Sequence, residues 1–285
     1  MIRTLVMVKA PVPGLVKTRL LLAPEQAAKF QEALIKDTVA KARALGEVTV
    51  AGTPTGDLNL IEPLIPKEAQ LIAQSGGDLG ERMFAAAFRL FEEGPEPLLV
   101  LGTDVPTLLP DSIRRAVRAL EGKSACDASI VGSTDGGYVL LGLKELYKPL
   151  FRGISWSTDA VYRETLEKAR RLDLSLYEGE PHYDVDTPED LVRLRAELAA
   201  RPDCAPRTAE LLESLKIVRW DSGHHSNCGG NGLSTYASNR QVRPSGWTFD
   251  RANLRSYVLH LGPRQARRKD RTGRGDCGRR GGGDA

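Results

Sequence analysis

Hydrophobic residues follow two alternating patterns along the first 201 residues of the chain. Short apolar runs rich in β-branched residues are typical of buried strands, whereas apolar residues three or four positions apart are typical of helices. The first pattern predicts strands at 4–8, 47–52, 69–74, 97–102, 128–133 and 138–143, and a weaker one at 174–178. The second predicts helices at 24–45, 80–93, 110–121, 157–171 and 187–200, with Asp111, Ser157 and Thr187 as candidate N-caps. Strands that alternate with helices predict an α/β fold with a mostly parallel sheet.

The regular pattern ends near residue 216. Residues 217–285 contain 12 of the 28 glycines but only 8 valine, isoleucine and leucine residues. Because so little apolar material cannot offset the entropy of ordering the chain, we expect a domain at 1–216 and a mostly disordered tail at 217–285. The abrupt change of composition would also fit a shifted reading frame.

The composition is that of a globular protein. Of the 285 residues, 41% are hydrophobic, which is enough for a substantial core. We expect a cytoplasmic protein without a membrane partner, because no apolar run is long enough to span a bilayer and the first residues show no signal-peptide pattern. The four cysteines are scattered without a C-x-x-C pair, which favours neither a zinc site nor a disulfide framework.

Charge divides the chain at the same boundary. The tail has 13 lysine and arginine residues against 5 aspartate and glutamate residues, whereas residues 1–216 have 27 against 32. A basic tail attracts phosphate backbones at low salt. Its aromatic residues all precede the most basic segment, so stacking and charge are not interleaved. We therefore expect at most weak, sequence-independent binding, and no specific nucleic acid as a partner.

The loop after the first predicted strand is rich in proline, glycine and cations. It reads VMVKAPVPGLVKTRL over 6–20 and lacks the spacing of the familiar phosphate loop, because Val16 precedes the lysine. Lys17 and Arg19 could still neutralise phosphate oxygens, and an arginine can bind two of them at once. The alternative is a solvated basic loop without a ligand.

A second glycine-rich loop, AQSGGDLGERM at 73–83, leads from a strand into a helix. Backbone N–H groups at a helix start can meet an anion or a base edge, and Gln74 and Arg82 could add contacts. The alternative is that Asp78 only caps the helix while the glycines form its turn.

Two carboxylates are candidate metal ligands. Asp104 ends the apolar run LLVLGTD, where an isolated carboxylate is costly unless a cation meets it, as Mg²⁺ on substrate phosphates would. In YDVDTPEDL, we expect Asp184 and Asp186 to point to opposite sides, and we favour Asp186 for the site. The alternatives are an aspartate that serves its own turn and an ordinary acidic helix start.

Two further positions are candidates for binding a second substrate. Gly136 and Gly137 in STDGGYVLLGL would let the backbone approach a ligand, or would simply form a tight hairpin. Trp156 lies just before a predicted helix, where its indole could stack on a ring or, more usually for a single tryptophan, pack under the helix.

Six motifs in this order resemble the DUF2064 family, the radical-SAM and selenodomain-associated transferase 1 group, which is related to phospholactate guanylyltransferases. The motifs are KAPVPGLVKTRL, SGGDLGERM, LGTDVPTL, STDGGYVLLGL, ISWST and DVDTPEDL. The resemblance covers about residues 1–215. It implies the three-layer α/β/α sandwich of GT-A-like glycosyl- and nucleotidyltransferases, with a nucleotide at the carboxyl ends of the strands.

The resemblance also implies roles for single residues. Lys17, Arg19 and Asp104 would be catalytic, and Asp104 and Asp186 would bind Mg²⁺ or Mn²⁺. The nucleotide would lie against Pro13, Gly14, Lys17, Thr18, Arg19, Gln74, Gly77, Asp78 and Arg82. The acceptor would lie against Gly136, Gly137, Tyr138 and Trp156.

These residues indicate a Mg²⁺-dependent transferase. In this interpretation an oxygen of a small phosphorylated or hydroxyl acceptor attacks the α-phosphorus of a nucleoside triphosphate and releases pyrophosphate. The alternative keeps the nucleotide site but transfers a sugar from a nucleotide-sugar donor. A weaker alternative is nucleic-acid binding through the basic tail. The expected partners are a nucleotide or nucleotide sugar and a small acceptor.

Overall fold

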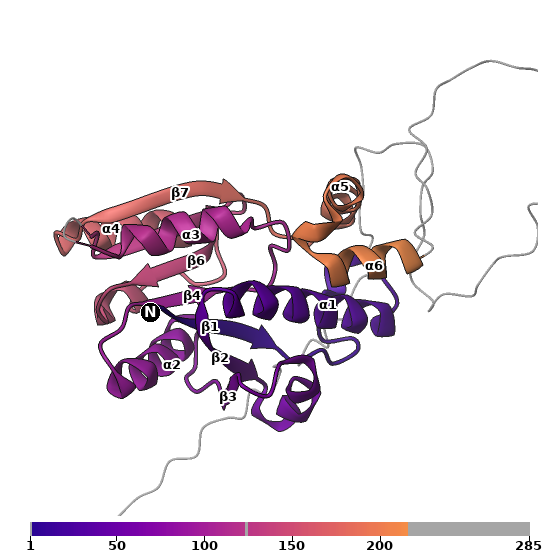
Figure 1. Cartoon of the computed structure of the whole chain (residues 1–285), viewed down its shortest axis with the longest axis horizontal. Helices are drawn as coiled ribbons and strands as arrows, with labels where there is room; N and C mark the ends of the chain where they lie inside the picture. The colour runs from indigo at the N-terminus through magenta and orange to yellow at the C-terminus, as the bar shows by residue number, and fades with distance from the viewer. Residues whose placement is uncertain (1, 123–124, 216–285) are drawn as a thin grey trace, which may run out of the picture. The chain divides into compact units, whose positions relative to one another are not determined.

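The computed structural model describes residues 2–122 and 125–215. The expectations for the tail at 217–285 lie outside the described residues. The described part contains a seven-stranded sheet with helices on both faces (Figure 1), which confirms the predicted α/β class. Within these ranges, no helix is both long and apolar enough to cross a membrane.

All seven predicted strands are present. They are β1 (Ile2–Lys9), β2 (Gly46–Thr53), β3 (Gln70–Ala73), β4 (Leu98–Leu101), β5 (Ala128–Ser133), β6 (Tyr138–Leu143) and β7 (Leu176–His182). Their order across the sheet is β3-β2-β1-β4-β6-β5-β7, and of these strands only β6 runs antiparallel to the rest. The carboxyl ends of the other six therefore share one edge of the sheet, which is where ligands bind in open sheets of this kind.

All five predicted helices are present, together with one that was not predicted. They are α1 (Pro24–Arg43), α2 (Leu79–Glu93), α3 (Pro110–Ala119), α4 (Val161–Arg171), α5 (Pro188–Ala200) and the additional α6 (Pro206–Ser214). Thr187 caps α5 as predicted, because its side chain accepts a hydrogen bond from the first turn. The caps predicted at Asp111 and Ser157 are wrong. α3 begins at Pro110, which puts Asp111 inside its first turn, and Ser157 lies in a left-handed turn (φ 65°) before α4.

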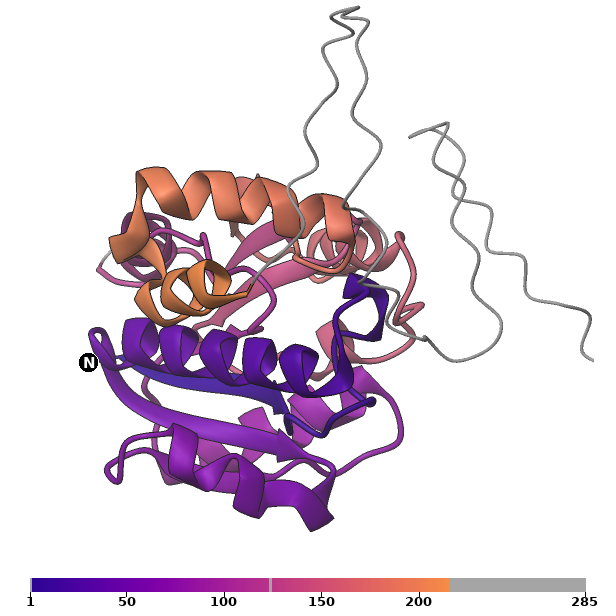
Figure 2. The same ribbon diagram turned by 90° about the vertical axis from the view of Figure 1, so that its right-hand side faces the viewer.

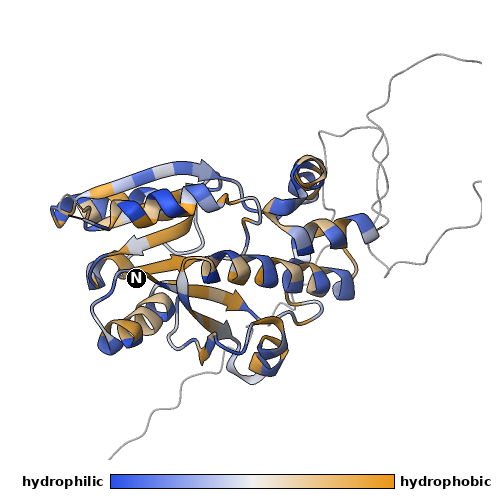
Figure 3. Cartoon of the chain, in the orientation of Figure 1, coloured by the Kyte–Doolittle hydropathy of each residue, from blue (hydrophilic) through white to orange (hydrophobic). Residues whose placement is uncertain are grey.

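The two faces of the sheet are buried by different helices. Neighbouring residues of a strand point to opposite faces, so Val6 and Val8 of β1 join one apolar cluster and Leu5 joins the other. α1 and α3 contribute to the first cluster, and α2 and α4 to the second. Figure 2 shows α1 running along the sheet, and Figure 3 shows apolar strands between helices that also carry hydrophilic faces. This is the three-layer arrangement that the resemblance implied.

A third apolar cluster packs α5 and α6 against α1. A buried carboxylate fixes this packing, because Asp37 of α1 accepts hydrogen bonds from the N–H of Arg207 (3.1 Å) and from the N–H (2.8 Å) and hydroxyl (2.7 Å) of Thr208. N–H groups in the first turn of a helix have no partner within the helix, so Asp37 caps α6 from outside it. The same cluster includes Leu20 and Val185, and so anchors two segments of the carboxyl edge.

Candidate active site

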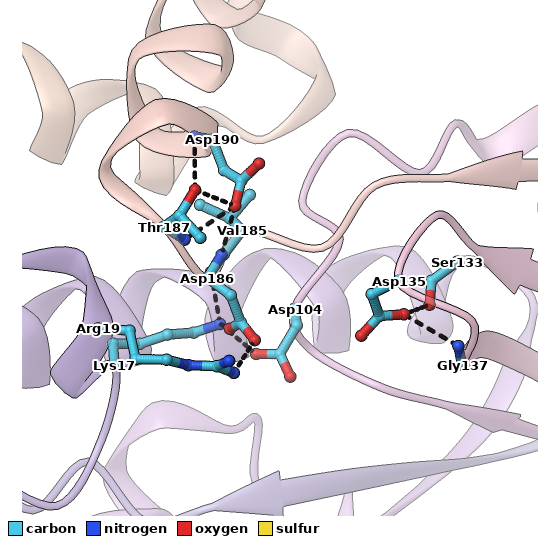
Figure 4. Close-up of polar contacts among 10 residues, drawn as sticks. All are labelled: Lys17, Arg19, Asp104, Ser133, Asp135, Gly137, Val185, Asp186, Thr187 and Asp190. Carbon is cyan, nitrogen blue, oxygen red and sulfur yellow. Dashed lines mark hydrogen bonds and ion pairs between the residues drawn. The ribbon is translucent and has the colours of Figure 1, made fainter. Parts of the chain in front are cut away.

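Four charged side chains meet at the carboxyl edge of the sheet (Figure 4). The Nζ of Lys17 lies 2.6 Å from Oδ1 of Asp104 and 3.1 Å from Oδ1 of Asp186, and it donates to the carbonyl of Val185 (2.8 Å). Arg19 donates to the other carboxylate oxygen of Asp186. The structure thus brings four of the predicted site residues together in one ion-pair network, which we call the charged cluster.

The charged cluster is assembled from three loops at strand ends. Lys17 and Arg19 lie in the loop after β1, Asp104 follows β4, and Asp186 follows β7. Two of these loops are joined through the N–H of Val185, which donates to the carbonyl of Asp104 (2.9 Å). The adjacency of β1 and β4 in the sheet explains why Lys17 and Asp104 meet. β7 lies three strands beyond β4, so it is the loop after β7 that brings Asp186 to them.

The start of α5 orients Asp186. The carboxylate of Asp190 accepts hydrogen bonds from the N–H of Asp186 (3.2 Å) and of Thr187 (2.8 Å), and Thr187 caps the helix in return. The sequence left a site aspartate and an ordinary acidic helix start as alternatives. In the structure this segment is a capped helix start that also brings Asp186 into the charged cluster, and a role of Asp186 in metal binding stays a prediction.

Lys17 is the buried member of the charged cluster. Its side chain is 5% exposed, against 50% for Asp104, 33% for Asp186 and 74% for Arg19. Burial alone would lower the pKa of Lys17, but the charges of Asp104 and Asp186 outweigh it and hold the pKa above its ordinary value. The backbone of Lys17 is left-handed (φ 47°), which costs a residue with a side chain about 1–2 kcal/mol. Such strain persists where the surrounding contacts over-determine it.

Part of the remaining first loop is open to solvent. Pro13, Gly14 and Thr18 are exposed. Gly14 has a φ of 78°, which favours a glycine. Lys9 at the end of β1 donates to the carbonyl of Leu15 (2.6 Å) and braces the loop. The three predicted residues are accessible to a ligand next to the charged cluster, and their role in nucleotide binding stays a prediction.

The second predicted loop is closed on itself. Asp78 caps α2 by accepting a hydrogen bond from the N–H of Glu81 (2.8 Å), and Glu81 in turn accepts one from the N–H of Gly77 (2.7 Å). Arg82 donates to the carbonyls of Gly76 (3.3 Å) and Gly77 (2.9 Å). The capping alternative therefore describes Asp78, and an anion approaching Gly77 would meet the carboxylate of Glu81.

Gln74 fastens the end of β3 to the neighbouring strands. Its Nε2 donates to the carbonyls of Val8 in β1 (3.2 Å) and Ala51 in β2 (2.8 Å). Both hydrogens of the amide nitrogen are used, so the amide oxygen is the atom that remains for a ligand.

Gly136 and Gly137 form the turn between β5 and β6. Gly136 has a φ of 91°, and a Cβ there would lie 2.1 Å from the carbonyl oxygen of Asp159. The turn therefore needs a glycine to pack against the segment before α4. The hairpin alternative describes this turn, and contact with an acceptor stays a prediction.

The two predicted aromatic acceptor contacts are used in packing. The hydroxyl of Tyr138 points at Sδ of Met83 (3.8 Å), and burial raises the pKa of Tyr138. Trp156 packs edge-on to Tyr138 with 6.3 Å between ring centroids, and its Nε1 would lie 2.4 Å from a Cβ at Gly80. These rings pack β6 against the first turn of α2, and an acceptor-binding role for either stays a prediction.

The sequence analysis missed a second pair of carboxyl groups at this edge. Asp135, in the turn after β5, accepts hydrogen bonds from the hydroxyl of Ser133 and the N–H of Gly137 (2.9 Å) (Figure 4). Burial alone would raise the pKa of Asp135, but these hydrogen bonds outweigh it and lower the pKa. Burial, and then the charges of Asp135 and Asp104, raise the pKa of Asp184 to about 7.

A signal for this carboxyl pair was present in the sequence. Asp135 closely follows a predicted strand, as Asp104 does. A search for polar residues at the carboxyl ends of strands would therefore have selected it. The reason for expecting Asp184 and Asp186 on opposite sides was wrong, because residues two apart on an extended segment share a side. Asp104 neighbours both, since its charge raises the pKa of Asp184 and Lys17 joins it to Asp186. What the pattern could not show is that the turn after β5 meets Asp184.

The donor set of the charged cluster fits a divalent cation. Oxygens of Asp104 and Asp186 converge on one ammonium group, so a cation in that position could bind both. Mg²⁺ usually binds one or two carboxylates together with waters and substrate phosphates. The described ranges contain no group of three or more His, Cys, Asp or Glu side chains suited to a metal. Substrate and water would therefore have to supply the remaining ligands.

Comparisons with known proteins agree with this architecture. The model of the DUF2064 family, described as "Uncharacterized protein conserved in bacteria", matches residues 35–158. A structure from Desulfovibrio desulfuricans G20, provisionally named a nucleotide-diphospho-sugar transferase, is 30% identical, with a TM-score of 0.69 over 75% of this chain and 94% of that one. A cytidylyltransferase from Leptospira borgpetersenii has a TM-score of 0.50 at 14% identity, over 75% of this chain and 92% of that one. No curated protein matches the chain.

The two structural relatives carry different weight. At 14% identity the cytidylyltransferase shows a shared fold alone. The relative at 30% identity is matched over nearly its whole length, and the family model covers the segments that contain the second loop, Asp104 and the turn after β5. The chain therefore belongs to the DUF2064 family and has the fold of the nucleotide-diphospho-sugar transferases.

Proposed function

We propose that the chain is a divalent-metal-dependent transferase acting on a nucleotide bound at the carboxyl edge of its sheet. The observation that carries the proposal is the charged cluster, in which two carboxylates lie against Lys17 and Arg19. Carboxylates that can share a metal ion and cations that can meet phosphates are the groups that a nucleotide site requires. The name of the 30% identical relative supports a transferase of this class.

The favoured reaction is nucleotidyl transfer. A bond forms between an acceptor oxygen and the α-phosphorus of a nucleoside triphosphate, the bond from that phosphorus to the oxygen bridging to the β-phosphate breaks, and pyrophosphate leaves. Asp104 and Asp186 would hold Mg²⁺ or Mn²⁺, which when bound neutralises charge on the phosphates. Arg19 is 74% exposed and keeps N–H groups that can bind phosphate oxygens. These residues act by positioning the phosphates and neutralising their charge.

The carboxyl pair of Asp135 and Asp184 favours a hydroxyl acceptor over a phosphorylated one. A carboxyl group that keeps its proton beside an ionised one offers a hydrogen-bond donor and several acceptors. A hydroxyl group can use both, whereas a second phosphate would be repelled by the carboxylate. We therefore place the acceptor hydroxyl near Asp135.

Glycosyl transfer is the second candidate, and the name of the 30% identical relative favours it. The same residues would hold the diphosphate of a nucleotide sugar. A bond would form between the acceptor oxygen and the anomeric carbon, the bond from that carbon to the diphosphate oxygen would break, and a nucleoside diphosphate would leave. The weaker alternative of nucleic-acid binding rests on the tail, which lies outside the described residues.

The released product distinguishes the two reactions. The full chain is incubated with Mg²⁺, an acceptor pool, and either each nucleoside triphosphate or each common nucleotide sugar. Pyrophosphate release supports nucleotidyl transfer, and nucleoside diphosphate release supports glycosyl transfer. If no donor gives an acceptor-dependent product, the proposed class of reaction is wrong.

Asp104→Asn tests the assignment of the charged cluster. The amide is nearly isosteric but carries no charge, so we expect kcat to fall roughly 10²–10³-fold, as when one main electrostatic contributor is removed. Asp111→Asn is the matched control, because its carboxylate is 71% exposed on α3 and pairs only with the nearby Arg114 among the described residues. A folded Asp104→Asn variant with the turnover of the control would remove Asp104 from the site.

A further inference from the structure

We infer that Lys17 is an internal counter-ion that occupies the cation position of the nucleotide-free site and gives it up when a nucleotide and a divalent metal bind. The inference rests on the proposed function and describes how that site is regulated. Its consequence is that the free protein binds the metal weakly, and that the nucleotide makes the metal position available by drawing Lys17 to its phosphates.

The ammonium group of Lys17 is saturated with hydrogen-bond acceptors. An ammonium group has three N–H donors, and three acceptors lie within bonding distance: Oδ1 of Asp104 (2.6 Å), Oδ1 of Asp186 (3.1 Å) and the carbonyl of Val185 (2.8 Å). With the side chain 5% exposed, no N–H is left for a phosphate. Lys17 can serve a nucleotide only after it leaves at least one of these partners.

The ammonium group of Lys17 and a metal ion would compete for the same carboxylate oxygens. The second oxygen of Asp186 is already bonded to Arg19, so a metal that used both carboxylates would have to take an oxygen that Lys17 holds. Two cations on one oxygen repel each other strongly in a partly buried site. Occupation by Lys17 and by the metal is therefore mutually exclusive, unless one carboxylate turns away.

The segment that carries Lys17 has unusual backbone angles. Lys17 and Leu21 both have left-handed backbones, with φ of 47° and 56°, and Gly14 in the same loop has a φ of 78°. Residues with side chains seldom adopt this region, so the ion pairs of Lys17 help to hold a conformation that relaxes when they are released. An unbranched side chain with four rotatable bonds can then turn toward a phosphate.

Exchange of Lys17 for the metal ion explains why this loop contains a lysine as well as an arginine. In the free protein two carboxylates and a carbonyl face one position, and an empty position would leave these oxygens repelling one another. A ligand supplied by the chain itself removes that repulsion and opposes binding of stray cations. By linkage, whatever draws Lys17 away from the carboxylates strengthens metal binding, and the metal strengthens nucleotide binding by the same factor.

The test measures Mn²⁺ affinity of the full chain without nucleotide, using paramagnetic resonance or calorimetry. Lys17→Met keeps the length of the side chain and removes the ammonium, so we expect Mn²⁺ to bind at least about tenfold more tightly than to the wild type. Lys9→Met is the matched control, because it removes an equal charge beside the same loop without freeing an oxygen of either carboxylate. We expect its Mn²⁺ affinity to change less than about threefold.

The outcomes separate this inference from the proposed function. An equal gain in Mn²⁺ affinity in both variants would overturn the inference. It would mean that the net positive charge near the site, and not competition for the carboxylate oxygens, sets the affinity. Unchanged Mn²⁺ affinity in Lys17→Met would overturn the inference too. Thermal unfolding with and without Mn²⁺ reports whether Lys17→Met folds. If it does not, Lys17→Gln is measured instead, because its amide can still donate to the carbonyl of Val185. The same titrations with each nucleoside triphosphate should show a smaller nucleotide-induced gain in Lys17→Met than in the wild type.

Failure of the proposed function has a different signature. If no nucleotide or nucleotide sugar binds, the Mn²⁺ gain in Lys17→Met still stands and the proposed substrate class is wrong. If nucleotide and Mn²⁺ bind together but Lys17→Met gains no Mn²⁺ affinity, the function stands and the counter-ion inference is wrong.

Discussion

The carboxyl group of Asp135 accepts a hydrogen bond from the hydroxyl of Ser133, and Asp184 lies close enough to both for them to shift its pKa. Two ionised carboxylates so close together would repel each other, and partial burial strengthens the repulsion. The pair is therefore most stable with one proton, which explains why the pKa of Asp184 is raised to about 7 while that of Asp135 is lowered. Perturbed groups of this kind at the edge of a sheet are candidates for substrate contact.

Asp184 should make the protein less stable as the pH rises. An aspartate in an unfolded chain has a pKa of about 3.9, and in the folded protein that of Asp184 is about 7. Since the folded state holds the proton more tightly, this stabilisation is complete below about pH 4 and is lost as the pH rises through about 7. After discounting for partial exposure, we expect about 1 kcal/mol, or roughly 2–4 °C in Tm, to be lost between pH 5 and pH 8.

Thermal unfolding of Asp184→Asn in EDTA measures this contribution. The amide does not ionise, so the variant should lose less stability than the wild type over the same pH range. Asp203→Asn, at an exposed position, should follow the wild type. If Tm depended on pH identically in Asp184→Asn and the wild type, this would contradict the raised pKa of Asp184.

The sequence placed the charged residues correctly along the chain but could not pair them. Because polar residues that follow parallel strands share one edge, Lys17, Asp104 and Asp186 were expected to be neighbours there. The bonds between Lys17 and both carboxylates depend on the loop geometry, which no local pattern records. For the same reason the sequence could not show that Asp78 caps α2 and that Gln74 donates to two neighbouring strands, and a ligand contact of either stays a prediction.

At the scale of elements, burial explains which parts were predictable. Strands covered on both faces read as unbroken apolar runs, so β1, β4, β5 and β6 were found at nearly their observed positions. α6 was missed because it is short and its cap comes from Asp37 on another helix. A contact across 171 positions leaves no trace in the local period of the sequence.

Asp37→Ala should loosen α6 from α1. The substitution leaves the N–H groups of Arg207 and Thr208 without their acceptor, and we expect a loss of about 2–3 kcal/mol in the free energy of unfolding. Thr208→Val removes only the hydroxyl bond and should cost about 1 kcal/mol. Urea unfolding of both variants measures the difference. An equal cost for the two would mean that the cap contributes nothing beyond the hydroxyl.

At the scale of the whole molecule, every proposed site residue lies before residue 216. A chain shortened to end at Leu215 keeps the three apolar clusters and the charged cluster. We therefore expect its Tm to lie within roughly 2–4 °C of the full chain and its Mn²⁺ and nucleotide affinities to be unchanged. Loss of nucleotide binding on shortening would place part of the site in residues 217–285.

The same pair of chains tests the nucleic-acid alternative. The full chain should bind a single-stranded oligonucleotide weakly at low salt, and the binding should fade as salt screens the charges. The shortened chain, which lacks the excess of basic residues, should not bind. Salt-resistant binding by the full chain would support a specific nucleic-acid partner.

The strand order has a consequence for how copies of this protein behave in a crowded solution. β3 and β7 end the sheet, and an edge strand offers unpaired N–H and C=O groups on which another molecule can extend the sheet. β3 has only four residues, which gives little to pair with. β7 is longer, but it is largely hydrophilic (Figure 3) and carries Glu178, Glu180 and Pro181, so a second copy would bring like charges together and meet a residue without an N–H. The short β3 and the charged β7 therefore also discourage aggregation of the protein.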